Sequence, residues 1–305
     1  MTSVSSSPLG PPPLPALPLP ALLPPVAVPD VAVLSRVTSR ALAMLHPLLD
    51  ELRVGPLDRS GRTAHTVKPD GSPVTPVDVE VDERIVAAVA ATFDGHGVVS
   101  EELDAVAGDH EWQWVVDPVD GTSNFAAGLP HWGVAIALCH GGVPVLGVVD
   151  APDLDRRWVA VRGDGCTRDG APVRVRTGVT INDPLTAHLP LFSSLSFLRQ
   201  VRPRAGVRLN PRVLGAMAVD AALVADGVGV ASAHAGGRVW DVAASAVLVT
   251  EAGGAAVALG DPVFPLVAGL DHAHVRVPSA FGTSQQLLEQ LIEALTPEDR
   301  PLLSP

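Results

Sequence analysis

The chain has 305 residues, of which 47% are hydrophobic and 18% charged, so it can bury a large core as one domain or as two closely joined halves. Its formal net charge of −12 excludes a general nucleic-acid-binding protein, because such proteins carry basic patches. The two cysteines, Cys139 and Cys166, show neither metal-ligand spacing nor a disulfide framework, which predicts buried thiols and a reducing, cytoplasmic location.

Residues 1–30 hold ten of the 30 prolines and no Lys or Arg, which predicts a disordered or polyproline-like tail. An upstream start codon is the alternative explanation for this segment. Its apolar part, 14–28, is broken by five prolines, so we expect neither a membrane-spanning helix nor a signal peptide. We expect no contact with membranes. The folded domain is predicted over residues 31–295, with a short tail at 296–305.

Hydrophobic periodicity predicts helices and strands that alternate irregularly along this domain. In chain order we expect a helix Val31–Arg53, a loop Pro56–His65, a helix Pro76–Phe93, strands Gly97–Val99, Trp112–Val116, Gly133–His140, Val143–Val149, Arg157–Val161 and Val173–Arg176, a helix Asn210–Gly227, a strand Val228–His234, and helices Asp241–Glu251 and Ser284–Leu295. Hairpin strands interleaved with helices indicate a mixed α and β fold, with two halves at about 31–180 and 181–295.

The most informative segment is residues 115–125, Val-Val-Asp-Pro-Val-Asp-Gly-Thr-Ser-Asn-Phe. Asp117 and Asp120 follow a buried strand, and Pro118 stiffens the turn between them. Gly121 then allows the backbone to approach a ligand closely. A rigid turn that offers carboxylates and then free N–H groups suits hard cations beside a phosphate, although a solvated Asp-Pro turn is the plain alternative.

Other acids occur at element ends. Glu101 and Glu102 follow a short apolar run, Asp241 opens a helix, and Asp78 lies in the first turn of a helix that Thr75 caps. Taken singly, Asp241 and Asp78 can be capping residues and Glu101 a surface acid. Carboxylates without a His/Cys cluster favour Mg²⁺ over Zn²⁺.

Taken together, these residues resemble the inositol monophosphatase family of metal-dependent, lithium-sensitive phosphatases. The resemblance covers about residues 31–295, and its pieces match in order and spacing: Lys68–Asp78, Ser100–Glu102, Asp117–Phe125, the hairpin Gly163–Gly170, and Trp240–Gly254. It implies a five-layer αβαβα sandwich of the inositol monophosphatase and fructose-1,6-bisphosphatase type, with metals between the two halves. It also implies a homodimer that hydrolyses a small phosphorylated polyol or sugar.

The resemblance assigns roles to individual residues. It implies two or three Mg²⁺ ions, which Mn²⁺ can replace: the first on Glu101, Asp117 and the Val119 carbonyl, the second on Asp117, Asp120 and Asp241, and a weaker third on Glu101 and waters.

The same resemblance implies that Glu101 and the Thr122 hydroxyl orient the attacking water, with Asp78 holding Thr122. The Gly121 and Thr122 N–H groups would bind phosphate. Lys68 lies near the third ion or is a surface lysine, and Glu102 lies behind the ligands or is exposed.

The chain departs from the family pattern on the alcohol side of the site. His234 stands where inositol-specific members carry an acid, and Met217 stands where they carry a small residue. Either residue shapes the alcohol site, or Met217 only packs and His234 is a solvated residue at a strand end. We therefore expect a phosphatase of inositol 1-phosphate or a related polyol phosphate. Fructose 1,6-bisphosphate and histidinol phosphate are alternative substrates, and a catalytically silent, dimeric binding module is a remote alternative.

Overall fold

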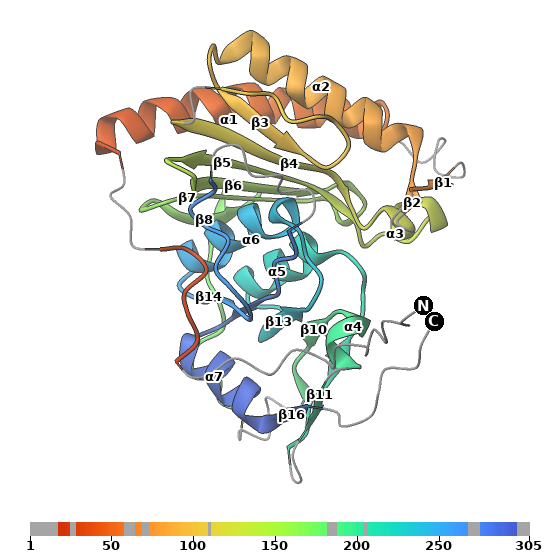
Figure 1. Cartoon of the computed structure of the whole chain (residues 1–305), viewed down its shortest axis with the longest axis vertical. Helices are drawn as coiled ribbons and strands as arrows, with labels where there is room; N and C mark the ends of the chain where they lie inside the picture. Colours follow the sequence, from red (N-terminus) through yellow and green to blue (C-terminus); the bar gives the residue numbers. More distant parts are fainter. Residues whose placement is uncertain are drawn as a thin grey trace, which may run out of the picture.

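The computed structural model describes residues 18–24, 29–57, 65–68, 73–108, 111–181, 188–199, 201–203, 207–267 and 275–297. Their helices and sheets stack in five layers, from two helices through a sheet, two helices and a second sheet to a last helix (Figure 1). This confirms the expected mixed αβαβα sandwich. Apolar clusters fill the spaces between the layers. None of the helices in these residues is long and apolar enough to cross a membrane.

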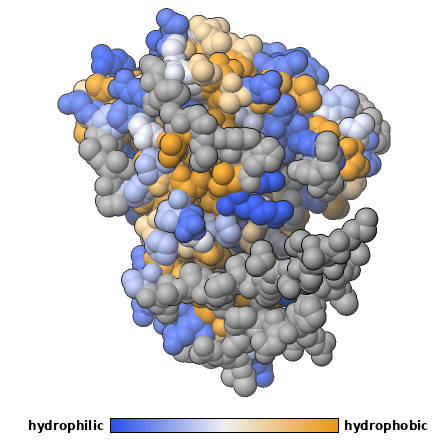
Figure 2. Space-filling view, in the orientation of Figure 1, coloured by the Kyte–Doolittle hydropathy of each residue, from blue (hydrophilic) through white to orange (hydrophobic). Residues whose placement is uncertain are grey.

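The first layer consists of α1 (Val31–Val54) and α2 (Pro76–Thr92), close to the predicted bounds. Both have a capped start, with the Asp30 side chain accepting from the Ala32 N–H, and Thr75 followed by a proline in the first turn. Their apolar faces recur at three- and four-residue intervals and pack on the sheet below. Hydrophilic side chains gather on the upper flanks of the molecule in Figure 2.

The second layer is a seven-stranded sheet in sequential order, in which only the first pair of strands is parallel. Its strands are β3 (Gly97–Ser100), β4 (Trp112–Asp120), β5 (Gly133–His140), β6 (Val143–Ala151), β7 (Arg156–Val161), β8 (Gly165–Arg168) and β9 (Ala171–Val173). The predicted strand Val173–Arg176 is wrong, because pairing with β8 ends at Val173. A two-stranded sheet, β1 (Thr66–Val67) and β2 (Pro73–Val74), a short helix α3 (Thr122–Ala127) and a 3-10 turn η2 (Pro152–Leu154) complete this half.

The third layer holds α5 (Met217–Ala225) and α6 (Val239–Glu251), which are apolar on almost every side because sheets cover both faces. The predicted helix start at Asn210 is wrong: 211–212 pair with β10, and Gly215 has a φ of 84°, which no helix residue adopts. The expected helix at 241–251 begins slightly earlier, at Val239.

The fourth layer is a five-stranded sheet of order β12 (Pro211–Arg212), β10 (Leu191–Ser193), β13 (Ala231–His234), β15 (Ser279–Gly282) and β14 (Ala255–Ala258). The outer helix α7 (Gln285–Ala294) covers it and is capped by Ser284. A short helix α4 (Leu195–Leu198) and the pair β11 (Val201–Pro203) and β16 (Leu295–Pro297) lie beside it. Residues 296–297, expected in the C-terminal tail, therefore belong to a strand.

Part of the expected N-terminal tail is ordered against the body, which corrects the prediction of a disordered segment over all of 1–30. Residues 18–24 run along the edge strand β14 (Figure 1). The Leu22 N–H donates to the Ala256 carbonyl (2.9 Å), and the Pro20 carbonyl accepts from the Ala258 N–H (2.9 Å). Prolines are compatible with this edge because the missing N–H groups are not the ones that pair. Residues 1–17, 25–28 and 298–305 lie outside the described part of the chain.

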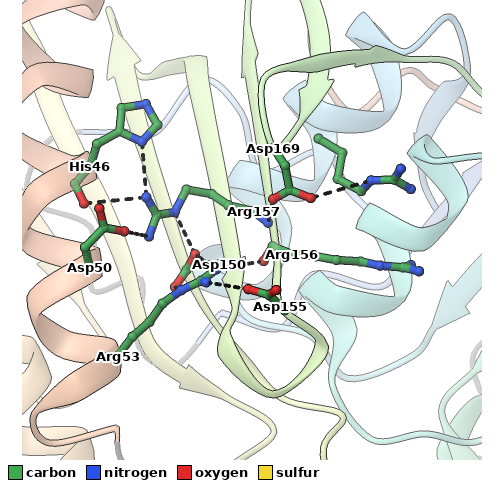
Figure 3. A network of polar contacts seen from close by, with 9 residues as sticks. His46, Asp50, Arg53, Asp150, Asp155, Arg156, Arg157 and Asp169 are labelled. Carbon is green, nitrogen blue, oxygen red and sulfur yellow. Dashed lines mark hydrogen bonds and ion pairs between the residues drawn. The ribbon is translucent and has the colours of Figure 1, made fainter.

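A buried ion-pair network joins α1 to the first sheet (Figure 3). Asp150, at the end of β6, is fully buried and accepts hydrogen bonds from Arg53 (2.7 and 3.0 Å) and from Arg157 (2.7 Å). Arg157 also pairs with Asp50 on α1 (2.8 Å). The two arginines compensate the buried carboxylate and fix the end of α1 on the sheet.

Candidate active site

A cavity of about 750 Å³ lies where the end of β4 meets the starts of α5 and α6. β4 continues through the Asp-Pro-x-Asp motif, and its register against β5 shifts between Asp117 and Asp120. Both aspartates are buried yet line the cavity. The predicted placement of these acids at a strand end is confirmed, although the strand is longer than expected.

Asp120 binds the N-terminus of α5. One of its oxygens accepts from the Met217 N–H (2.8 Å), and the other accepts from the N–H groups of Ala218 (2.8 Å) and Val219 (3.1 Å). A carboxylate satisfies the free N–H groups of a helix start and is favoured there by the helix dipole. No local signal in the sequence predicts this contact, since almost one hundred residues separate its partners.

Asp241 lies in the first turn of α6, three residues after the cap residue Arg238, and accepts from the Arg238 N–H. It therefore supports the helix start, as the capping interpretation predicts, and it also lines the cavity. Carboxylate oxygens of Asp117, Asp120 and Asp241 lie within 4.8 Å of one another.

The electrostatics of this cluster favour a cation. Burial, followed by repulsion from Glu101, Asp120 and Asp241, raises the pKa of Asp117 well above its ordinary value. Burial raises the pKa of Asp120 to about 7 and that of Asp241 to about 8. Two buried carboxylates and a half-buried one so close together are stable as anions only with positive charge between them. An all-oxygen donor set of this kind fits Mg²⁺.

Glu101 follows β3 and faces the same cavity. Lys68 donates to Glu101 (3.0 Å) and to Glu102 (2.5 Å), so it belongs to the site and is not an isolated surface lysine. The Glu102 side chain is almost fully buried, and burial raises its pKa to about 7. Glu101 therefore presents one oxygen to Lys68, and within the described part of the chain no hydrogen bond occupies the other.

Thr122 and Asp78 are in direct contact. The Thr122 hydroxyl lies 2.9 Å from Asp78 Oδ1 and 3.0 Å from the Val119 carbonyl. The other Asp78 oxygen accepts from the N–H and hydroxyl of Thr75. Asp78 is thus both a capping-box residue and the partner of Thr122. Gly121, at the start of α3, has a φ of 88°, which a glycine adopts without strain.

Met217 and His234 both line the cavity. Met217 is the first residue of α5, and its sulfur packs against Gly237. His234, at the end of β13, is buried, with Nε2 2.6 Å from the Ser232 hydroxyl. The interpretation of His234 as a solvated residue is therefore wrong. Burial lowers its pKa to about 3, so it is neutral.

Sequence reasoning missed part of the cavity wall. Ser193, Ser194 and Ser196 come from β10 and α4, and Arg238 and Arg276 precede α6 and β15. Arg238 stands three residues before Asp241, and that spacing is a signal that could have found it. The others come from distant segments without a shared motif.

Comparisons with known proteins identify the family of the chain. The model of the inositol monophosphatase family matches residues 36–297. The chain is 36% identical to the probable inositol 1-monophosphatase ImpA of Mycobacterium tuberculosis over 68% of this chain and 82% of the relative. It is 38% identical to the histidinol-phosphatase of the same organism, over 70% of this chain and 83% of the relative.

The fold is also found among solved structures. The Thermotoga maritima IMPase superposes with a TM-score of 0.66 at 25% identity, covering 85% of this chain and 96% of that one. The matched part of the chain includes every acidic residue of the cavity. The chain therefore belongs to the inositol monophosphatase family and is a metal-dependent phosphomonoesterase.

Proposed function

We propose that this enzyme hydrolyses a small phosphate monoester with Mg²⁺ in the cavity between its two halves. The observation that carries the proposal is the cluster of Asp117, Asp120 and Asp241, two buried and one half-buried, whose carboxylate oxygens lie within 4.8 Å of one another. Glu101, Asp117 and the Val119 carbonyl would hold one ion, and Asp117, Asp120 and Asp241 a second. A third, weaker ion would use Glu101. When bound, Mg²⁺ supplies a water of lowered pKa and stabilises negative charge on the phosphate.

Asp120 is the most constrained of these ligands. Its two oxygens already accept three N–H groups from α5, and each carboxylate oxygen has further lone pairs for a cation. The same hydrogen bonds fix the carboxylate in one orientation. Binding a cation would therefore cost this side chain little conformational freedom.

Thr122 and Glu101 would orient the attacking water. The Thr122 hydroxyl donates to Asp78 or to the Val119 carbonyl, so its lone pairs are free to accept a proton from water. Glu101, held by Lys68 through one oxygen, accepts the other water proton with its free oxygen. Two acceptors leave the lone pair of the water directed at phosphorus. The N–H groups of Gly121 and Thr122 would bind the phosphate oxygens.

The substrate class follows from the family and from the relatives. Inositol 1-phosphate or a related polyol phosphate is the first candidate. Fructose 1,6-bisphosphate and histidinol phosphate are the alternatives, since one relative is a histidinol-phosphatase and another, from Aquifex aeolicus, a fructose-1,6-bisphosphatase/inositol-1-monophosphatase. We further propose inhibition by Li⁺, a homodimer and a cytoplasmic location. A silent binding module is disfavoured because every expected ligand acid lines the cavity.

A phosphate-release assay tests the proposal. The protein is incubated with inositol 1-phosphate, fructose 1,6-bisphosphate or histidinol phosphate in Mg²⁺, with and without Li⁺. We expect turnover of at least one ester and its inhibition by Li⁺. No phosphate release from any of the three, with Mg²⁺ shown to bind, would refute the proposed function.

A further inference from the structure

The cavity wall opposite the first sheet carries positive charge and hydroxyl groups. We call the residues Arg238, Arg276, Ser194 and Ser196 the basic wall; all four line the cavity and come from the second half of the chain. Among the described lining residues, the carboxylates are Glu101, Asp117, Asp120 and Asp241, each assigned above to metal or water.

The two arginines differ in what they face. Arg238 is half-buried. Its charge lowers the pKa of Asp241, against the larger upward effect of burial on that pKa. Arg276 is exposed, and its Nη1 would lie 3.3 Å from a Cβ placed on Gly236, so it lies over the loop between β13 and α6. Within the described part of the chain it has no salt-bridge partner. Its guanidinium therefore lies at the cavity with no carboxylate partner among the described residues.

Hydroxyl groups add to this arrangement. The Ser194 hydroxyl accepts from the N–H groups of Phe197 (3.2 Å) and Ala235 (3.3 Å), which fixes it between α4 and the β13–α6 loop. Ser196 lies 3.0 Å from it and is exposed to the cavity. His234 beside them is hydrogen-bonded to Ser232 and is neutral, so it does not add to the positive charge of the arginines.

The cavity is also larger than a phosphate group and its ions need, and its volume is in the range of sites that enclose a whole small ligand. The cavity therefore has room for the alcohol part of the substrate as well, and the basic wall lines that cavity. A neutral polyol leaves the guanidinium of Arg276 without a charged partner, and a cationic alcohol is repelled by it. An anionic group gains charge-assisted hydrogen bonds there.

We propose that the preferred substrate carries a second anionic group on its alcohol part, which Arg276 binds together with the Ser196 hydroxyl. This inference rests on the proposed phosphatase function and narrows it to phosphate esters with a second phosphate. A sugar bisphosphate and a nucleotide bisphosphate share that chemistry. Arg276 is then a specificity residue, and it is separate from the groups that act on the scissile phosphate.

Steady-state kinetics on four substrates test the proposal: fructose 1,6-bisphosphate, 3′-phosphoadenosine 5′-phosphate, inositol 1-phosphate and histidinol phosphate. The wild-type kcat/KM should be highest for one of the two bisphosphates, and which one identifies the source. Arg276→Gln should lower that value about 10- to 100-fold, the usual effect of losing a hydrogen bond to a charged group. It should change inositol 1-phosphate turnover by less than about threefold. Arg276→Lys should recover part of the lost kcat/KM. The control Arg36→Gln, on the exposed face of α1, should leave kcat/KM unchanged for all four substrates.

A binding measurement separates failure of the Arg276 assignment from failure of the proposed phosphatase function. In thermal-shift titrations with Mg²⁺, Arg276→Gln should weaken fructose 6-phosphate or adenosine 5′-phosphate binding and leave inorganic phosphate binding unchanged. The inference is overturned if Arg276→Gln lowers kcat/KM equally for all four substrates, or if it changes kcat/KM for none of them. It is also overturned if the wild-type kcat/KM is highest for a monophosphate. Absence of all phosphate release with intact ligand binding refutes the proposed function, and the binding titration still decides whether Arg276 holds a second anion.

Discussion

Shortening Leu22 to alanine should destabilise the protein, although the residue lies in a segment whose composition predicts disorder. Leu22 is 0% exposed and belongs to the core between the two sheets, whereas Leu19 is 2% exposed and packs under α7. A buried Leu→Ala change costs about 2–5 kcal/mol in an element that cannot detach. This segment can detach, so the loss cannot exceed its docking free energy.

That docking free energy can be estimated from the contacts. Burial of two leucines contributes about 3–6 kcal/mol. Ordering the chain opposes this by about 1–2 kcal/mol per residue, less at Pro18, Pro20 and Pro24, whose φ is already fixed. For the four other residues the two terms are of similar size, and because the segment is docked its docking free energy is positive but no more than about 2 kcal/mol. We therefore expect Leu22→Ala to cost about 1–2 kcal/mol, which lowers the melting temperature by about 2–8 °C.

Differential scanning calorimetry of Leu22→Ala, of a chain beginning at Pro29, and of Val31→Ala would test this estimate. The shorter chain keeps the Asp30 cap of α1, so any fall in its melting temperature reports the loss of the docked segment alone. Val31 is 79% exposed and serves as the control. If Leu22→Ala and the shortened chain both melt within 1 °C of the Val31→Ala control (about 0.3 kcal/mol), the segment contributes nothing and the reasoning is refuted.

Three further predictions concern the ion-pair network and the active site. Asp150→Asn should lower the free energy of unfolding in urea by about 3 kcal/mol, because it leaves two partly buried arginines without their carboxylate. The control Asp155→Asn, at a side chain that is 94% exposed, should lower it by less than about 0.5 kcal/mol. Equal losses of unfolding free energy in the two variants would contradict the network. In EDTA the melting temperature should fall as the pH rises from about 5 to about 8.5, since burial raises the pKa of Asp120 and Asp241 and the native state then holds protons that the unfolded chain has released. Mg²⁺ should abolish this fall, and a melting temperature that rises with pH in EDTA would refute the electrostatic argument. Thr122→Val should lower kcat about 100-fold, and Thr122→Ser should retain most activity, as expected when the hydroxyl orients water; equal kcat in the two variants would exclude that role.

The helices, the strands and the acids of the site could be predicted from the sequence because they depend on local patterns, whereas the five-layer stacking followed from the family resemblance. Helix caps at Thr75 and Ser284, strand runs and the Asp-Pro-x-Asp turn are encoded within a few neighbouring residues. The spacing of Asp117 and Asp241 could be matched to a family because each acid stands at the end of a regular element.

The missed features depend on contacts between distant segments. Nothing in the sequence around Leu22 indicates an edge strand, since its partner Ala256 is more than two hundred residues away. The start of α5 was placed too early because Gly215 and the pairing of 211–212 override an apolar run. Arg276 was missed because only the fold brings it to the same cavity as Asp117.

The most direct test of the account is metal binding and turnover by Asp117→Asn. Asp117 is the residue assigned to both principal ions, so neutralising it should weaken both. Isothermal titration should show weaker Mg²⁺ binding, and phosphate release at saturating Mg²⁺ should show a kcat below about 1% of wild type. Without metal, the melting temperature should equal or exceed that of wild type, because one of the repelling carboxylates is gone. Near wild-type kcat in this variant, or full wild-type activity in EDTA, would contradict the account.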